Sequence, residues 1–183
     1  MKKFLLVLLF SIFYFTSHSQ TYLKFNGTHA LFAIPSIGIE VGIAPKMTFQ
    51  LDATMSFWNS INNRPWVFNQ IFPEVRYYFK EKNKGFYTGV HVGYGMFKLS
   101  KNKSYAKANK YQYGYIYFTG ITTGYQWKVK EKWLLDLFIG GGWSQANYEG
   151  FEKDTGARYD KLGINYSAQS IPYRGGLMIG YQF

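Results

Sequence analysis

The chain ends in Tyr173-Arg174-Gly175-Gly176-Leu177-Met178-Ile179-Gly180-Tyr181-Gln182-Phe183, where larger apolar residues alternate with other types. The side chains of a β-strand point alternately to opposite faces of its sheet. One face of this stretch would carry Tyr173, Gly175, Leu177, Ile179, Tyr181 and Phe183, and the other Arg174, Gly176, Met178, Gly180 and Gln182. The alternation therefore predicts a strand with one apolar and one mixed face.

The same alternation recurs along the chain, most plainly at 47–58 and 132–145, whereas sustained helical periodicity is hard to find. The runs predict strands near residues 22–33, 37–43, 47–58, 67–79, 85–98, 113–127, 132–145 and 170–183. Short connections (44–46, 80–84, 128–131) alternate with longer ones (59–66, 99–112, 146–169), and residues 34–36 are expected to form a tight hairpin. This loop asymmetry is typical of membrane barrels. We therefore predict an all-β fold, an eight-stranded antiparallel up-and-down transmembrane β-barrel with both termini at the short turns.

The composition suits one such domain and excludes several other classes of protein. The 183 residues include 21 Lys and Arg against 10 Asp and Glu, a net charge of +11, and 21% are aromatic. The absence of Cys excludes a disulfide scaffold, a Cys-ligated zinc site, a thiol nucleophile and a lipid-modified N-terminal Cys. Beyond residue 15, no run of about 18 apolar residues is available for a membrane-spanning helix.

The first residues have the pattern of an export signal. Lys2 and Lys3 precede an apolar stretch from Phe4 to Phe15, and small residues in Ser17-His18-Ser19 follow it. This order predicts a cleaved signal peptide over residues 1–19 and leaves 20–183 as the barrel. We therefore expect export and a location in the outer membrane.

The polar faces of the predicted strands carry charged residues. If the apolar faces point outward, the residues that point into the lumen are Lys24, Glu40, Asp52, Glu74, Arg76, His91, Asp136 and Arg174. A ring of eight strands is only wide enough for side chains to fill it, so these residues would form a packed network and not an aqueous pore. In this register Tyr173 and His29 point outward. The alternative is a soluble exported lipocalin-like barrel, which would bury these charges in a site meant for apolar ligands.

Several motifs carry a resemblance to a known family. They are Leu23-Lys24-x-Asn26, Pro35-Ser36-Ile37-Gly38-Ile39-Glu40, Phe72-Pro73-Glu74-Val75-Arg76-Tyr77-Tyr78-Phe79 and Gly124-Tyr125-Gln126-Trp127. With the signal and the terminal aromatic residue, the chain resembles a domain-of-unknown-function family of small, porin-like outer-membrane barrels of Gram-negative bacteria. The resemblance implies insertion by the barrel-assembly machinery, which would recognise the last strand through Leu177, Ile179, Tyr181 and Phe183. It implies no reaction.

The residues themselves do not indicate a reaction either. After the signal, the chain has two histidines, His29 and His91, and His91 has no neighbouring Ser in an evident motif. Lipid A acyl chemistry, which small outer-membrane barrels also perform, would need a His with a Ser and an acid. Two histidines without an acidic cluster also do not indicate a metal site. We therefore predict no catalytic, cofactor-binding or metal site, and a lipid-modifying enzyme stays the alternative.

A basic outer loop suggests what the protein contacts. Lys101, Lys103, Lys107 and Lys110 lie in this loop, with tyrosines among them. In an exported membrane protein this pattern suits lipopolysaccharide phosphates better than nucleic acid, although it is also the pattern of solubilising charge. The sequence thus predicts a non-enzymatic outer-membrane barrel in a structural, surface-interaction or assembly-partner role. Its expected partners are outer-membrane lipids, lipopolysaccharide, the assembly machinery and another outer-membrane or surface protein, with no cofactor and no nucleic acid.

Overall fold

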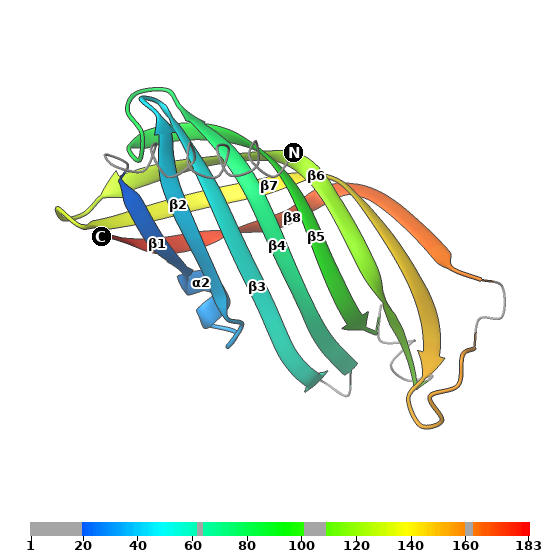
Figure 1. Cartoon of the computed structure of the whole chain (residues 1–183). Helices are drawn as coiled ribbons and strands as arrows, with labels where there is room; N and C mark the ends of the chain where they lie inside the picture. The colour runs from blue at the N-terminus through cyan, green and yellow to red at the C-terminus, as the bar shows by residue number, and fades with distance from the viewer. Residues whose placement is uncertain (1–19, 62–63, 101–108, 160–162) are drawn as a thin grey trace, which may run out of the picture.

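The computed structural model describes residues 20–61, 64–100, 109–159 and 163–183, and in these residues eight antiparallel strands form one closed ring (Figure 1). The signal peptide predicted over residues 1–19 lies outside the described residues. The strands are β1 (Thr21–Asn26), β2 (Ser36–Ala44), β3 (Met47–Ile61), β4 (Arg64–Tyr78), β5 (Gly85–Leu99), β6 (Lys110–Lys128), β7 (Trp133–Glu152) and β8 (Asn165–Gln182). Each strand pairs with its neighbours in the chain, and β1 pairs with β8. The predicted eight-stranded up-and-down order is confirmed.

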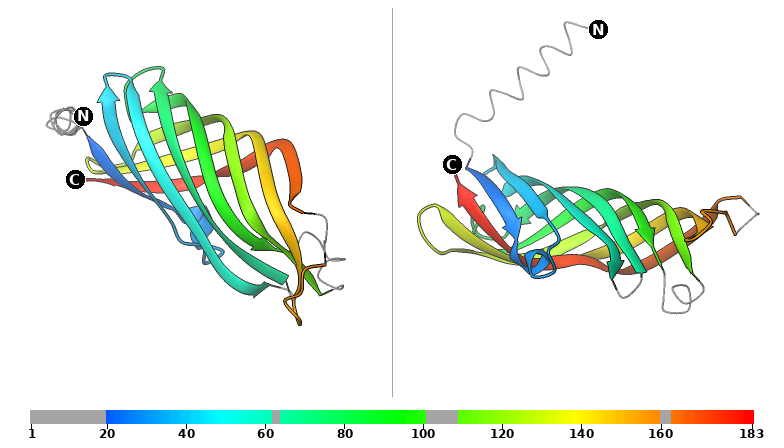
Figure 2. Two further views of the ribbon diagram at one scale, coloured as in Figure 1. Left: turned by 45° about the vertical axis from the view of Figure 1, so that its right-hand side comes forward. Right: turned by 90° about the horizontal axis from the view of Figure 1, so that it is seen from below.

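The two ends of the ring differ, as the connections show. The short connections β2–β3, β4–β5 and β6–β7 lie at the end where the chain terminates, which we call the turn end (Figure 1). There the amide of Phe183 donates to the carbonyl of Thr21 at 3.3 Å, and the amide of Gln182 donates to Lys132 at 2.8 Å. We call the opposite end the loop end. Strands β3 to β8 extend much further toward it than β1 and β2 do (Figure 2).

The longer connections predicted at the loop end are wrong in extent, because the strands continue into them. Ile61 pairs with Arg64, so the predicted loop 59–66 is mostly ladder. The predicted loops 99–112 and 146–169 likewise shorten to the residues between Leu99 and Lys110 and between Glu152 and Asn165. These extensions are rich in Asn, Ser, Gln and Glu. Their apolar alternation is weak although the backbone pairing continues. Alternation therefore predicts strand ends that lie short of the true ones.

The predicted first strand, 22–33, is also wrong, because a helical turn replaces its second half. β1 ends at Asn26, and α2 (Gly27–Ala30) follows. The Asn26 side chain accepts hydrogen bonds from the backbone amides of Thr28 and His29 at 3.1 and 3.2 Å, an N-cap that favours the helix over a continued strand. The expected hairpin at 34–36 is therefore a longer connection. His29, predicted to face outward, instead lines the lumen.

A bulge in β8 overturns the predicted direction of Tyr173. Gly140 pairs with Arg174 while the next residue, Gly141, pairs with Pro172, so β8 has one extra residue at this point. A bulge lets two successive side chains point the same way. The rings of Tyr173 and Phe72 accordingly stack inside the lumen with centroids 6.1 Å apart. Sequence alternation alone cannot reveal this shift.

The interior of the ring is mostly polar at the turn end. Its largest fully buried side chain is Arg76, whose guanidinium lies over the Tyr87 ring, and this ring packs against that of Tyr78. Gly124 makes room for this packing, because a Cβ there would lie 2.6 Å from the Tyr87 hydroxyl. Among the described residues, no helix has both the length and the apolar character needed to cross a bilayer.

Candidate functional site

Four charged side chains from four strands form a compact cluster in the lumen, which we call the charged floor. Lys24 (β1), Glu40 (β2), Arg76 (β4) and Asp136 (β7) are each 0% exposed. The Lys24 ammonium contacts Glu40 and lies 2.7 Å from Asp136 Oδ2. Arg76 Nη1 lies 2.7 Å from the same Asp136 oxygen and 3.4 Å from Glu40 Oε2. Cations and acids thus alternate around the cluster, and each charge has a partner of opposite sign.

Neutral groups complete the hydrogen bonding of the two floor acids. The Tyr78 hydroxyl donates to Glu40 at 2.6 Å, and the Tyr87 hydroxyl donates to Asp136 at 2.8 Å. The Gln126 amide donates to both carboxylates at 3.1 Å. Buried charges are tolerated when they are paired and hydrogen-bonded, and both conditions hold here.

A second charged group lies next to the floor on its loop-end side. Arg174 donates to Asp52 at 2.6 Å and to Glu74 at 2.9 Å. Glu74 also accepts from Arg76 Nε at 3.0 Å, so it joins this group to the floor. Gly89 makes room for Glu74, because a Cβ at this position would meet the carboxylate at 2.5 Å. Seven of the eight residues predicted to share the lumen are therefore connected by ion pairs.

The eighth predicted residue, His91, lies beside this network but outside its ion pairs. Its Nε2 lies 2.6 Å from the Tyr173 hydroxyl and its Nδ1 lies 2.9 Å from the Thr122 hydroxyl. The ring also packs edge-on against Phe72, and Phe118 completes this aromatic layer with a centroid 4.7 Å from that of Tyr173. The aromatic layer was not predicted, and its only sequence signal was that Phe72 and Phe118 fall on the polar side of their strands.

The other predicted residues lie on the outside or outside the described part. Leu177, Ile179 and Phe183 face outward with exposed side chains, and the Tyr181 ring packs between Trp133 and Phe183. Lys110 begins β6, with its ammonium 4.6 Å from the Tyr159 ring centroid. The remaining lysines of the basic outer loop, Lys101, Lys103 and Lys107, lie outside the described residues.

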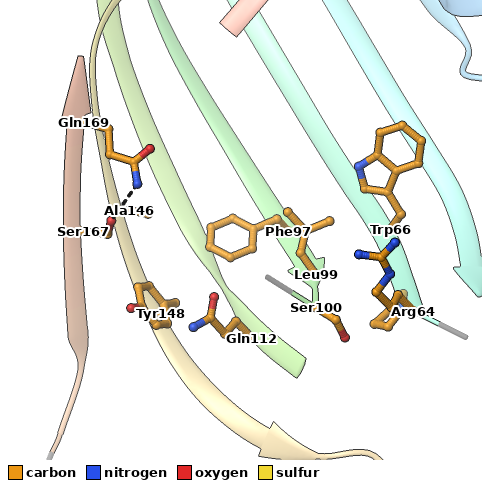
Figure 3. Close-up of a pocket in the computed structure, with 11 residues that line it drawn as sticks. Arg64, Trp66, Phe97, Leu99, Ser100, Gln112, Ala146, Tyr148, Ser167 and Gln169 are labelled. Atoms are coloured by element: carbon orange, nitrogen blue, oxygen red, sulfur yellow. Dashed lines mark hydrogen bonds between the residues drawn. The ribbon is translucent and has the colours of Figure 1, made fainter. Parts of the chain in front are cut away.

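Toward the loop end the lumen is hollow, and the expectation that side chains fill it is wrong there. A mouth cavity of about 510 Å³ opens between β4, β5, β6, β7 and β8 (Figure 3). Trp66, Phe97, Leu99 and Tyr148 supply much of its wall, with Arg64 near its opening. A deep cavity of about 340 Å³ continues from it toward Arg174. The signal that was overlooked is a change in the inward-facing residues, from charged near the turn end to Trp, Phe and Leu near the loop end.

The acids of the lumen are engaged in ion pairs and are not grouped as metal ligands among the described residues. In the described ranges, no group of three or more His, Asp or Glu side chains is arranged to hold a metal ion. The acids that come closest together already bind Lys24, Arg76 and Arg174. The arrangement can hold the strands together and close one end of the lumen.

Comparison with known families assigns nearly the whole chain to one family. A family described as "Protein of unknown function (DUF3575)" matches residues 4–183. The chain belongs to the DUF3575 family. Neither a curated protein nor a solved structure matched it in the same comparisons. Proteins of this family have no assigned activity in its description, so membership does not give the function.

Proposed function

We propose that this DUF3575 protein is an integral outer-membrane barrel without enzymatic activity, in a structural, surface-interaction or assembly-partner role. One observation carries the proposal: the ring is apolar where it is exposed and charged where it is buried. Soluble proteins have the opposite distribution, because the hydrophobic effect removes apolar side chains from water. Lipid is the solvent in which this distribution is stable.

The exposed apolar belt runs around the whole ring. All eight strands contribute to it, with Leu23, Phe25, Ile37, Ile39, Met55, Phe57, Ile71, Val90, Val92, Ile121, Leu137, Ile139, Leu177 and Ile179. Soluble monomers rarely expose contiguous apolar patches larger than a few hundred Å². A belt on every strand far exceeds such a patch, which supports insertion into a membrane.

Aromatic residues border the belt at both ends and give its height. Near the turn end, Trp127 packs against Tyr125 with centroids 4.6 Å apart. Toward the loop end, Tyr117 packs against Tyr94 at 5.5 Å. Trp127 and Tyr117 are ten positions apart on β6. At about 3.3 Å per residue and a strand tilt of about 40°, this spans roughly 25 Å, the height of the apolar band of outer-membrane barrels.

The alternatives fit the contacts less well. Lipid A acyl chemistry needs a histidine oriented by an acid beside a nucleophile, whereas the ring nitrogens of His91 bind the hydroxyls of Tyr173 and Thr122. The Thr122 side chain is 0% exposed, so a substrate has no access to it. A soluble lipocalin-like barrel would leave the apolar belt in water. The proposed partners are therefore the surrounding lipids, lipopolysaccharide phosphates at the basic loop, and the assembly machinery at the last strand.

Cell fractionation with a heat-modifiability gel tests the proposal. A closed membrane barrel satisfies every backbone group in its own ladder and resists detergent until heated. We expect the protein in the outer-membrane fraction, with a band that shifts on boiling. A protein found soluble in the periplasm, without a shift, would overturn the proposal.

A paired substitution sharpens this test. Val90 lies in the belt and is 63% exposed, and Arg in its place would meet lipid at a cost of about 2–4 kcal/mol in a membrane barrel. On the surface of a soluble barrel the same change would cost little. Ala168→Arg, at an exposed position near the loop end, is the matched control. We expect Val90→Arg alone to lower the free energy of unfolding; equal stability of the two variants would contradict membrane insertion.

A further inference from the structure

The mouth cavity and the deep cavity adjoin each other, and the proposed structural role does not use them. Trp66, Phe97, Leu99 and Ala146 line both of them. The wall is largely aromatic and aliphatic, and it comes from five strands that are distant in the sequence (Figure 3). Volumes of about 510 and 340 Å³ lie in the range of small-molecule sites. The section that the two cavities share is apolar, which suits a hydrocarbon chain.

Polar groups lie at both ends of this space, and those at the deep end, such as Asp52 with Arg174 and Ser36 with Thr54, are bound to each other. The rim carries a second polar group. Arg64, Gln112 and Gln169 supply a guanidinium and two amides there, with the hydroxyls of Ser100 and Ser167 beside them. Arg64 forms no ion pair within the described residues, in contrast to the arginines deeper in the lumen. A rim with an uncompensated guanidinium and several hydrogen-bonding groups suits an anionic head group.

The charged groups at the other end of the space are already paired with each other. Arg174, which lines the deep cavity, is already bound by Asp52 at 2.6 Å and by Glu74 at 2.9 Å. In the lumen as a whole, the ion-pair network contains three cations (Lys24, Arg76, Arg174) and four acids (Glu40, Asp52, Glu74, Asp136). The deep end therefore offers an anion no unpaired cation, whereas Arg64 at the rim is unpaired within the described residues. This difference fixes the direction in which an amphiphile would bind.

We propose that the lumen binds a single-chain anionic amphiphile, with its hydrocarbon chain along Trp66, Phe97 and Leu99 and its head group at Arg64. The proposal goes beyond the membrane role, although its test uses the membrane-inserted protein; failure to enter nanodiscs would contradict the membrane role, and absence of binding by the inserted protein would contradict this proposal. The head group stays at the loop end, and the chain points toward the aromatic layer around Phe72.

Tryptophan fluorescence gives a direct test, because one of the five tryptophans lines both cavities. In a variant with Trp58, Trp127, Trp133 and Trp143 replaced by Phe, the fluorescence of Trp66 reports the cavity. Terminally brominated dodecanoate is titrated into this folded variant in phosphatidylcholine nanodiscs. We expect saturable quenching, and about fourfold tighter binding per added methylene from octanoate to dodecanoate. Should the variant not fold, calorimetry of the wild-type protein against empty nanodiscs measures the same binding.

Two pairs of variants separate binding in the cavity from partition into lipid. Ala146→Phe fills the cavity and should abolish saturable quenching, whereas Ala168→Phe, on the outer face at nearly the same level of the ring, should leave it unchanged. Arg64→Gln should weaken dodecanoate binding about tenfold without affecting dodecanol. Quenching that does not saturate, that survives Ala146→Phe, or that is as strong with dodecyltrimethylammonium would overturn the proposal.

Discussion

Arg76 offers the sharpest test of the lumen network, because it joins both charged groups. Its guanidinium donates to Glu74 through Nε at 3.0 Å and to Asp136 through Nη1 at 2.7 Å, and it lies 3.4 Å from Glu40. It also lies 4.5 Å from the centroid of the Tyr87 ring. Replacing Arg76 by Ala would therefore leave three buried carboxylates with too few cations.

The expected loss of stability in Arg76→Ala depends on the ion pairs that remain. Lys24 still binds Glu40 and Asp136, and Arg174 still binds Glu74, so the acids are underpaired but not isolated. Breaking a buried ion pair by removing one partner costs about 3–5 kcal/mol. We expect Arg76→Ala to lower the free energy of unfolding by that amount.

Urea unfolding of the refolded protein, followed by tryptophan fluorescence, measures this loss. With a slope of about 2 kcal/mol per molar urea, the midpoint should fall by roughly 2 M. Arg76→Lys keeps the charge but loses the forked geometry, so its urea midpoint should lie between those of Arg76→Ala and the wild type. Lys128→Ala, at an exposed position, should stay within about 0.5 kcal/mol. An unchanged midpoint for Arg76→Ala would refute the argument that the lumen charges hold the ring together.

Three further outcomes follow from the contacts. Asp136→Asn should lower the free energy of unfolding by about 3–5 kcal/mol, because this carboxylate accepts from two cations, a tyrosine and an amide. Asp52→Asn should lower it by about 1 kcal/mol, because Asp52 loses chiefly its bond to one guanidinium. Urea midpoints of the two variants check this order. Gly124→Ala should cost about 1–3 kcal/mol, because its Cβ would displace the Tyr87 hydroxyl 2.6 Å away, and thermal unfolding measures the loss. Deleting Phe183 should lower outer-membrane levels while export continues, as quantified by fractionation.

Controls make each of these outcomes decisive. Gly27→Ala should be nearly neutral, because the nearest atom to its Cβ would be 3.5 Å away; equal losses at both glycines would remove the steric argument. Phe183→Trp keeps a terminal aromatic ring and should retain normal levels. If the deletion variant also reaches normal levels, the last residue is not an assembly signal.

The inward residues could be predicted because alternation and charge agree on most strands. Lys24, Glu40, Arg76 and Asp136 all fall on the polar side of their strands, at positions where the register is regular. Their pairing across the lumen then follows from the narrow diameter of an eight-stranded ring. Which cation binds which acid could not be predicted, because register and tilt decide it.

The features that were missed arise where a local interaction overrides alternation. The side chain of Asn26 caps α2 and ends β1, and no apolar pattern encodes that choice. The bulge opposite Gly140 and Gly141 turns Tyr173 inward, next to glycines that constrain the backbone little. The cavity could not be predicted from the sequence, because a void depends on the summed volumes of many side chains and has no motif. All three lie toward the loop end, where the candidate ligand site is.

The charged floor has a consequence for the passage of solutes through the lumen. The residues of the charged floor and their neighbours Tyr22, Leu134 and Gln126 are at most 1% exposed, so buried side chains close the turn end of the lumen. A solute that enters the lumen at the loop end would meet these buried side chains and would have to leave by the loop end again. The amphiphile proposed above would then enter and leave by the loop end, and its occupancy would follow its concentration on that side of the ring.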